Sequence, residues 1–184
     1  MNVKLKKLFI LTLIIILMVG GYYFLARTDS KILPAGFFSD IIFTIPGRRP
    51  PEGSREYLSE RYGFSLFYPR EMSVSEFDEG GGASSFVFED TQNAQGFQIF
   101  VLPYLEKQVS EERFLRDVPS GVREDPKGFS INGISATSFY SKSLELGDTW
   151  EIWFIREGYL YEITTFRGLE TWLGDILSTW QFIP

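Results

Sequence analysis

The sequence predicts an α+β fold, in which an antiparallel β-sheet is flanked by helices and preceded by one N-terminal transmembrane helix. Three observations lead to this prediction. A long uncharged apolar run lies near the start of the chain. Short segments with alternating apolar residues, separated by turn residues, follow from Tyr57 onward. Two further stretches carry apolar residues at helical spacing.

The apolar run is Leu8–Ala26, with the sequence LFILTLIIILMVGGYYFLA. At about 1.5 Å of rise per residue, a helix of this length spans roughly 28 Å, close to the thickness of the bilayer hydrocarbon. Lys4, Lys6 and Lys7 precede the run, whereas Arg27 alone follows it before the acidic part of the chain. This bias predicts a cytoplasmic N-terminus and an extracytoplasmic C-terminal domain, anchored in the cell membrane by a single pass.

Tyr22 and Tyr23 lie near the outer end of the run, where amphipathic rings favour the level of the lipid headgroups. A cleaved secretory signal is the alternative, since it also has a basic start and an apolar core. The run exceeds the core of about 7 to 15 residues that is usual for signals, and bulky Phe24 stands two positions before Ala26, the nearest small residue. We therefore expect an uncleaved anchor. A buried helix of a soluble protein would need a core on all its sides.

The chain divides into four expected segments: a cytoplasmic N-terminus at 1–7, the anchor at 8–26, a linker at 27–54 and an extracytoplasmic domain at 55–184. The linker ends in Pro46–Gly53, whose proline and glycine content is typical of an extended connection. Within it, Arg48 and Arg49 are expected to be solvated or, alternatively, to contact lipid headgroups.

Composition limits the possible functions of the exported domain. Aromatic residues make up 17% of the chain, which favours a packed interior, and the chain contains neither histidine nor cysteine. This excludes thiol nucleophiles, imidazole bases and the usual zinc sites. The first 27 residues hold four of the 18 basic residues and no acid, so 14 basic and 24 acidic residues remain, a net charge of −10. Such a domain would repel nucleic acid, which we do not expect as a partner.

Turn residues separate the segments that we expect to be strands: Tyr57–Arg61, Phe64–Tyr68, Val74–Asp78, Ser84–Glu89, Gln98–Tyr104, Phe129–Ser143 with a turn at Asn132-Gly133, Thr149–Ile155 and Tyr159–Phe166. The last two carry apolar residues on both faces, with Trp150 on one side and Trp153 on the other. This predicts a central hairpin with helices over both faces. The polar stretch Ser120–Gly128 is expected to be irregular.

Two helices are expected in the domain. Val109–Val118 begins with Ser110 as a possible N-cap and ends before Pro119. Its buried face would consist of Phe114, Leu115 and Val118. The second helix lies within Leu169–Trp180, where apolar residues three and four positions apart form one stripe.

Signals for chemistry are weak. The glycines at 80–82 lack the lysine and helix that a phosphate loop needs, so we interpret them as a hairpin tip. Three acidic pairs lack the spacing of a calcium loop and are interpreted as solvated charge: Glu76 with Asp78, Glu89 with Asp90, and Glu124 with Asp125. Trp153, beside Glu151 and Ile155, suits core packing or else a ligand groove. No catalytic or metal-binding residue is predicted, and cofactor ligands stay unknown.

Four segments resemble the PsbP-like domains, a family named for an extrinsic subunit of the photosynthetic oxygen-evolving complex and also found in anchored bacterial proteins: Gly63–Pro69, Gly96–Val101, Ile131–Ala136 and Ile176–Phe182. The match covers roughly Tyr57 to Phe182 and consists of strand and helix positions. The resemblance implies an α/β/α sandwich outside the cytoplasm with a non-catalytic accessory or binding role. Metal association within the family is not carried over, because its ligand positions have no match here.

The leading hypothesis is a membrane-anchored extracytoplasmic binding or assembly module without catalytic activity. Its partners would be the lipid bilayer, through the N-terminal helix, and another envelope protein or a small ligand. One alternative is a carboxylate-dependent hydrolase of the cell envelope, which requires two acids about 5 to 10 Å apart across a groove. Another is a structural subunit of a membrane complex, which requires a broad exposed apolar patch.

Overall fold

The computed structural model describes residues 48–143 and 147–183. The predicted anchor, with Lys4, Lys6, Lys7, Tyr22 and Tyr23, lies outside these ranges. Within them, neither helix has the length and apolar character needed to span a bilayer. In chain order the elements are β1 (Ser54–Ser59), β2 (Phe64–Pro69), β3 (Ser73–Gly80), β4 (Ala83–Asp90), β5 (Gln95–Pro103), α2 (Glu111–Asp117), β6 (Glu124–Ile131), β7 (Ile134–Ser143), β8 (Gly147–Arg156), β9 (Tyr159–Phe166), α3 (Glu170–Leu177) and β10 (Gln181–Phe182).

The larger sheet has seven antiparallel strands in the order β3-β4-β5-β9-β8-β7-β6. Two meanders, β3-β4-β5 and β6-β7-β8-β9, join where β5 pairs with β9. The connection between the meanders carries α2. The expected hairpins are therefore confirmed, and β8 and β9 lie in the middle of the sheet as predicted. At Asn132-Gly133, both residues have positive φ, 45° and 83°, as a two-residue hairpin turn with this sequence favours.

The first hairpin does not join this sheet. Strands β1 and β2 form a separate three-stranded sheet in which β10 pairs with β2. The Ile183 N–H donates to the Gly63 carbonyl at 2.9 Å. Gly63 has φ +65°, and a Cβ there would lie 3.1 Å from the Ile183 carbonyl oxygen, so glycine permits both the turn and the close approach. The single sheet that was expected is thus replaced by two sheets.

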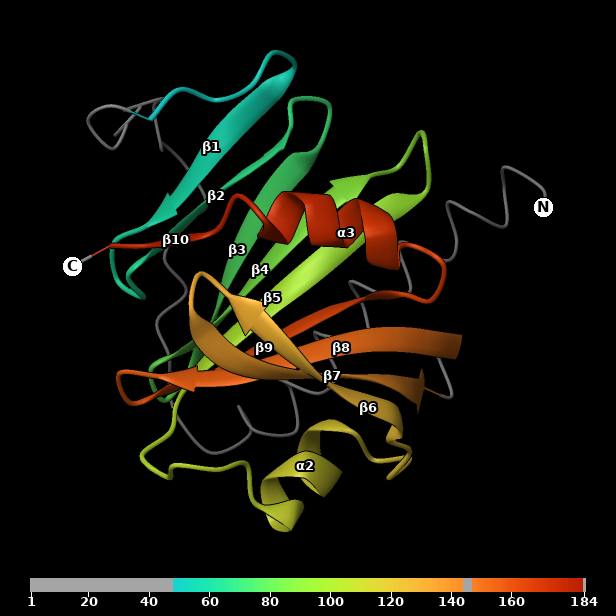
Figure 1. Ribbon diagram of the computed structural model, residues 1–184. Helices are drawn as coiled ribbons and strands as arrows, with labels where there is room; N and C mark the ends of the chain where they lie inside the picture. The colour runs from blue at the N-terminus through green and yellow to red at the C-terminus, as the bar shows by residue number, and fades with distance from the viewer. Residues whose placement is uncertain (1–47, 144–146, 184) are drawn as a thin grey trace.

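The main core lies between one face of the large sheet and a layer made of α3 and the small sheet (Figure 1). Helix α3 buries Leu173, Ile176 and Leu177, which confirms the predicted apolar stripe. Trp180 follows the helix and stacks on Phe64 of β2, with ring centroids 4.5 Å apart. Aromatic packing therefore fastens the helix and the small sheet to the large sheet.

Helix α2 covers part of the opposite face of the sheet (Figure 1). Phe114 and Val118 pack on Phe139 and Trp153, so both faces of the central hairpin are covered, as predicted. Leu115, predicted to be buried, is 47% exposed. That prediction was wrong because a helix of seven residues presents one narrow face to the sheet: positions 114 and 118 share it, while 115 lies about 100° away.

Two further expectations were wrong. Strand β6 begins at Glu124, inside the stretch expected to be irregular, because its polar residues pair with β7 through a register shift between Glu124 and Lys127. Arg48 is not solvated: its side chain is only 11% exposed. It donates to Ser65 Oγ at 2.8 Å and also to the Thr179 carbonyl, and its guanidinium lies over the Phe67 ring. The end of the expected linker therefore packs against the small sheet.

Candidate functional site

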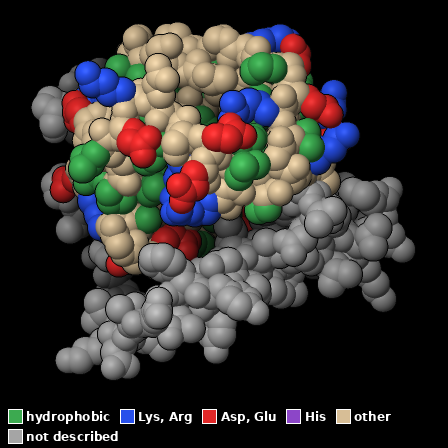
Figure 2. Space-filling view, turned by 90° about the horizontal axis from the view of Figure 1, so that it is seen from below, with side chains coloured by type: hydrophobic (Ala, Val, Ile, Leu, Met, Phe, Trp, Pro, Cys, Tyr) green, Lys and Arg blue, Asp and Glu red, His purple; other side chains and the backbone are tan. Residues whose placement is uncertain are grey.

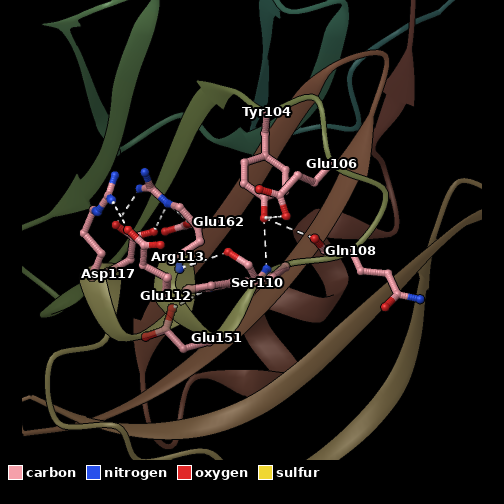
Figure 3. A network of polar contacts seen from close by, with 11 residues as sticks. Tyr104, Glu106, Gln108, Ser110, Glu112, Arg113, Asp117, Glu151 and Glu162 are labelled. Carbon is pink, nitrogen blue, oxygen red and sulfur yellow. Dashed lines mark hydrogen bonds and ion pairs between the residues drawn. The ribbon is translucent and has the colours of Figure 1, made fainter.

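The loop that leads into α2 is organised around Tyr104. Its backbone N–H donates to the Gly158 carbonyl at 2.6 Å. Its hydroxyl accepts from the Ser110 N–H at 2.9 Å and lies 3.1 Å from the Gln108 carbonyl, with a carboxylate oxygen of Glu106 at 3.2 Å as an alternative acceptor (Figure 3). Because Tyr104 is itself buried at the end of β5, this hub fixes where α2 begins.

Ser110 is the N-cap of α2, as predicted, and its hydroxyl oxygen accepts from the Arg113 N–H at 3.2 Å. Phe114 lies 5.8 Å from both Phe139 and Trp153, measured between ring centroids. The guanidinium of Arg123 lies 3.7 Å from the centre of the Phe114 ring and 5.8 Å from that of Phe139. A helix of seven residues is marginal by itself, so these contacts supply its stability.

Three acidic side chains meet beneath α2. Asp117, at the end of the helix, accepts two hydrogen bonds from the Arg113 guanidinium, and the same guanidinium lies 3.9 Å from Glu162 Oε1 on β9. A side-chain hydrogen bond joins Glu162 to Asp117. Figure 3 shows Arg113 and Asp117 from the helix converging on Glu162 from the sheet. The helix is therefore fastened to the central strand by polar as well as apolar contacts.

Glu151 is the third acid, on β8. Thr149 and Thr164 hydroxyls donate to it at 2.7 and 2.6 Å, and Trp153 Nε1 donates at 3.4 Å. Cross-strand pairing brings these groups together, because Glu151 stands opposite Thr164 and Trp153 opposite Glu162. Both oxygens of Glu151 are thus hydrogen-bonded. By contrast, the Oε1 atom of Glu162 has no hydrogen-bond partner within the described part of the chain.

Burial raises the pKa of all three carboxyls. The pKa of Glu162 rises furthest, because the charge of Asp117 adds to the effect of burial. The Arg113 guanidinium and the hydrogen bond from Glu162 act in the opposite direction on Asp117. Of the two carboxyls, Glu162 therefore holds a proton more readily, and Asp117 is the one paired with the Arg113 guanidinium. Chemically, the arrangement is a closed proton-sharing pair that holds a helix.

Replacing Glu162 with glutamine is expected to flatten the pH dependence of stability. An unfolded Glu ionises near about pH 4.3, whereas burial raises the pKa of folded Glu162 above this value, so the parent loses stability as pH rises through the folded pKa. The slope for one proton is at most about 1.4 kcal/mol per pH unit. Urea unfolding of the full chain in detergent at pH 5, 6, 7 and 8 measures it. Glu112→Gln on the exposed side of α2 should keep the parental slope, and a parental slope in Glu162→Gln would show that the raised pKa of Glu162 does not cause the pH dependence.

Trp153 is a core residue, 5% exposed between Phe114 and Phe139, so the packing interpretation is confirmed and the groove interpretation is wrong. Glu151, noted in the sequence only as its neighbour, belongs to the acid cluster. Glu162 was missed. The available signal was an acid in the middle of the apolar strand YLYEITTF, on the same face as Thr164.

The three acidic pairs remain separate from the cluster. Glu124 pairs with Lys142 and Asp125 with Lys127, all four exposed. Glu76 and Asp78 are exposed on β3, as expected. For Glu89 and Asp90 the expectation of solvated charge was wrong: Asp90 is buried and accepts from the backbone N–H groups of Gln92 and Asn93 in the turn after β4, and burial raises the pKa of the half-buried Glu89. The glycines at 80–82 form the β3–β4 turn, as expected. Among the described residues, no three acids are placed so that they could hold a metal ion.

A shallow pocket of about 30 Å³ opens beside the threonines that hold Glu151, lined by Gly96, Phe97, Gln98, Thr149, Thr164, Thr165 and Phe166. This volume suits about one water molecule. Figure 2, seen from the α2 side, shows acidic and basic side chains interspersed over the described part of that face. The acidic side chains of the site are thus buried between α2 and the sheet, and the surface above them carries both positive and negative charges.

Comparison of the sequence with known protein families and with curated proteins finds no match. The solution structure of the cyanobacterial PsbP protein CyanoP, from Synechocystis sp. PCC 6803, is similar in fold: the TM-score is 0.54 at 12% identity, over 76% of this chain and 98% of CyanoP. A crystal structure from Bacteroides thetaiotaomicron VPI-5482 has a TM-score of 0.45 at 14% identity, over 72% of this chain and 49% of that one. The likeness to CyanoP confirms the PsbP-like part of the predicted fold, which is antiparallel β-structure with two helices.

Proposed function

We propose that this protein is a single-pass membrane protein that presents its PsbP-like domain outside the cytoplasm as a non-catalytic binding or assembly module. The observation that carries the proposal is the PsbP-like fold together with the inward use of its buried acids. Thr149, Trp153 and Thr164 donate to Glu151, and Arg113 pairs with Asp117 beside Glu162 beneath α2. The uncharged run Leu8–Ala26 and the lysines before it support the anchor and its direction.

The two alternatives fit the described residues less well. Glycoside-cleaving carboxyls stand about 5 to 10 Å apart with room for sugar and water. Glu162 and Asp117 instead share a hydrogen bond beneath a helix. A purely structural subunit would need a broad apolar surface. The large apolar side chains exposed in the described ranges are Leu105 and Leu115, and two leucines do not form such a surface.

The membrane topology gives a direct test. With a C-terminal epitope on the full chain, we expect alkaline carbonate to leave the protein in the membrane, detergent to release it, and external protease to remove the epitope from intact spheroplasts. Replacing Lys4, Lys6 and Lys7 with glutamate removes the orienting charge and should lower the protease-accessible fraction several-fold. Substituting glutamate for the described surface residues Lys107, Lys127 and Lys142 changes charge equally and should leave topology unchanged. A chain released by carbonate would refute the anchor.

The binding role is tested on detergent-solubilised membranes. We expect the full chain to run as a stoichiometric complex with one envelope protein, or to retain one small ligand, and to lack turnover on a broad hydrolase panel. Turnover that is lost in Glu151→Gln or Glu162→Gln, with folding intact by circular dichroism, would show that the buried acids are catalytic and would overturn the proposal.

A further inference from the structure

The two outer edges of the large sheet differ. It ends in β3 on one side and β6 on the other, and no strand in the described ranges pairs with the outer edge of either. Strand β6 is interrupted by Pro126 and by the register shift next to it, where Asp125 has φ 50°. Prolines and bulges of this kind prevent another chain from adding to a sheet edge. The β6 edge is therefore protected.

Strand β3 has no such protection. From Ser73 to Asp78 it pairs with β4 without interruption, its register shift comes only after Asp78, and it contains neither proline nor lysine. In an antiparallel ladder, alternate residues of an edge strand direct their N–H and C=O groups away from the sheet. Over six residues this edge offers roughly 20 Å of regular hydrogen-bonding backbone.

The side chains along this edge are acidic. Glu76 and Asp78 are exposed on one face of the strand, and the half-buried Glu79 follows at the register shift. Tyr57 donates a hydrogen bond to Glu76 at 3.2 Å, and Asp78 accepts from the Gly80 N–H at 2.9 Å. No ion pair within the described residues involves any of these three carboxylates. The edge thus combines open backbone with uncompensated negative charge.

The negative charge of this edge determines which kind of strand can pair with β3. A second copy of the chain, added antiparallel through its own β3, would bring Glu76 and Asp78 of both copies close together across the new ladder. Like charges on facing strands are destabilising, whereas opposite charges stabilise the pair. A strand with lysine or arginine at alternate positions would instead place positive charges opposite Glu76 and Asp78.

We propose that the outer edge of β3 binds an extended, basic segment of a partner protein, which adds an eighth strand to the large sheet. Backbone hydrogen bonds supply affinity, and alternate basic side chains supply selectivity. The inference rests on the proposed binding role and names the kind of partner that the role requires.

Hydrogen exchange on the full chain in non-ionic detergent tests the edge directly. The probe is a capped peptide of about ten residues in which lysine and valine alternate, and the matched probe has glutamate in place of lysine. We expect the lysine peptide to slow exchange of the outward β3 amides about tenfold and the glutamate peptide to have no effect. The double variant Glu76→Lys/Asp78→Lys should bind the lysine peptide about tenfold more weakly and gain affinity for the glutamate peptide.

A variant with the same change in net charge, Asp148→Lys/Glu157→Lys, lies away from β3 and should bind the lysine peptide as the parent does. The proposal fails if β3 amides already exchange slowly in the free chain, if protection appears elsewhere, or if the two double variants behave alike. If the chain forms its stoichiometric envelope complex and the β3 variants keep it, the edge proposal falls while the binding role stands. If no complex exists but the lysine peptide protects β3, the binding role falls instead.

Discussion

Replacing Arg113 with methionine is expected to lower the free energy of unfolding by about 3 to 5 kcal/mol at pH 8. Methionine keeps most of the apolar stem but removes the cation that lies between Asp117 and Glu162. Asp117 is then a poorly compensated anion next to the buried carboxyl of Glu162. Removing one partner of a buried ion pair lowers stability by more than the intact pair contributes, because the remaining charge stays buried without its counterion. The Arg113 and Asp117 side chains are each 14% exposed, so water replaces little of the lost contact.

The loss should depend on pH. Arg113 lowers the pKa of Asp117 against the effect of burial, so without it the folded pKa rises further above the unfolded value. A carboxyl with a raised folded pKa loses stability as pH rises and regains it as pH falls. We therefore expect part of the deficit at pH 8 to disappear at pH 5 in urea unfolding followed by tryptophan fluorescence. Arg116→Met, at a 62% exposed position of the same helix, should cost less than about 1 kcal/mol at either pH. Equal losses in the two variants would mean that the cluster does not hold α2.

The order of the hairpins was predictable because its signals are local. Asn132-Gly133 marks a tight turn, and the doubly apolar strands β8 and β9 have the pattern of central strands. Ser110 marked the start of α2 through its own hydrogen bond to the helix backbone. Each of these features depends on residues within a few positions of one another, so sequence spacing was sufficient to find it.

The acid cluster and the small sheet were not predictable in this way, because distant residues create them. Glu162 is an isolated acid in an apolar strand until α2 places Arg113 and Asp117 above it. Strand β10 has two residues, too few for any periodicity, and it exists because β2 accepts it more than a hundred positions away along the chain. Arg48 was interpreted as a solvated linker charge because Thr179, which accepts from it, lies 131 positions away along the chain. In each case, tertiary pairing overrides local composition.

Replacing Trp180 with alanine is expected to cost about 3 to 5 kcal/mol, the usual range for removing a buried aromatic side chain. Trp180 is 2% exposed and stacks on Phe64 of β2. Its ring also contacts Phe154 of β8 at 5.8 Å and Phe182 of β10 at 5.8 Å between centroids. One side chain therefore joins both sheets, and the cavity left by alanine would open at their junction.

Trp180→Phe separates packing from the polar edge of the ring. Trp180 Nε1 has no hydrogen-bond partner among the described residues, so phenylalanine removes an unsatisfied donor along with part of the volume. Phenylalanine should therefore cost less than half as much as alanine. Trp172→Ala on α3, a half-buried ring that meets Phe97 edge-on at 5.9 Å, is the matched control and should also cost less than half as much. Urea unfolding of the full chain in detergent measures all three variants. In hydrogen exchange, Trp180→Ala should release β1, β2 and β10 before the seven-stranded sheet, because the ring contacts Phe64 and Phe182 of the small sheet and Phe154 of the large one. Simultaneous release of both sheets would show that the other aromatic contacts between them, such as Phe64 with Phe86, are sufficient for the attachment.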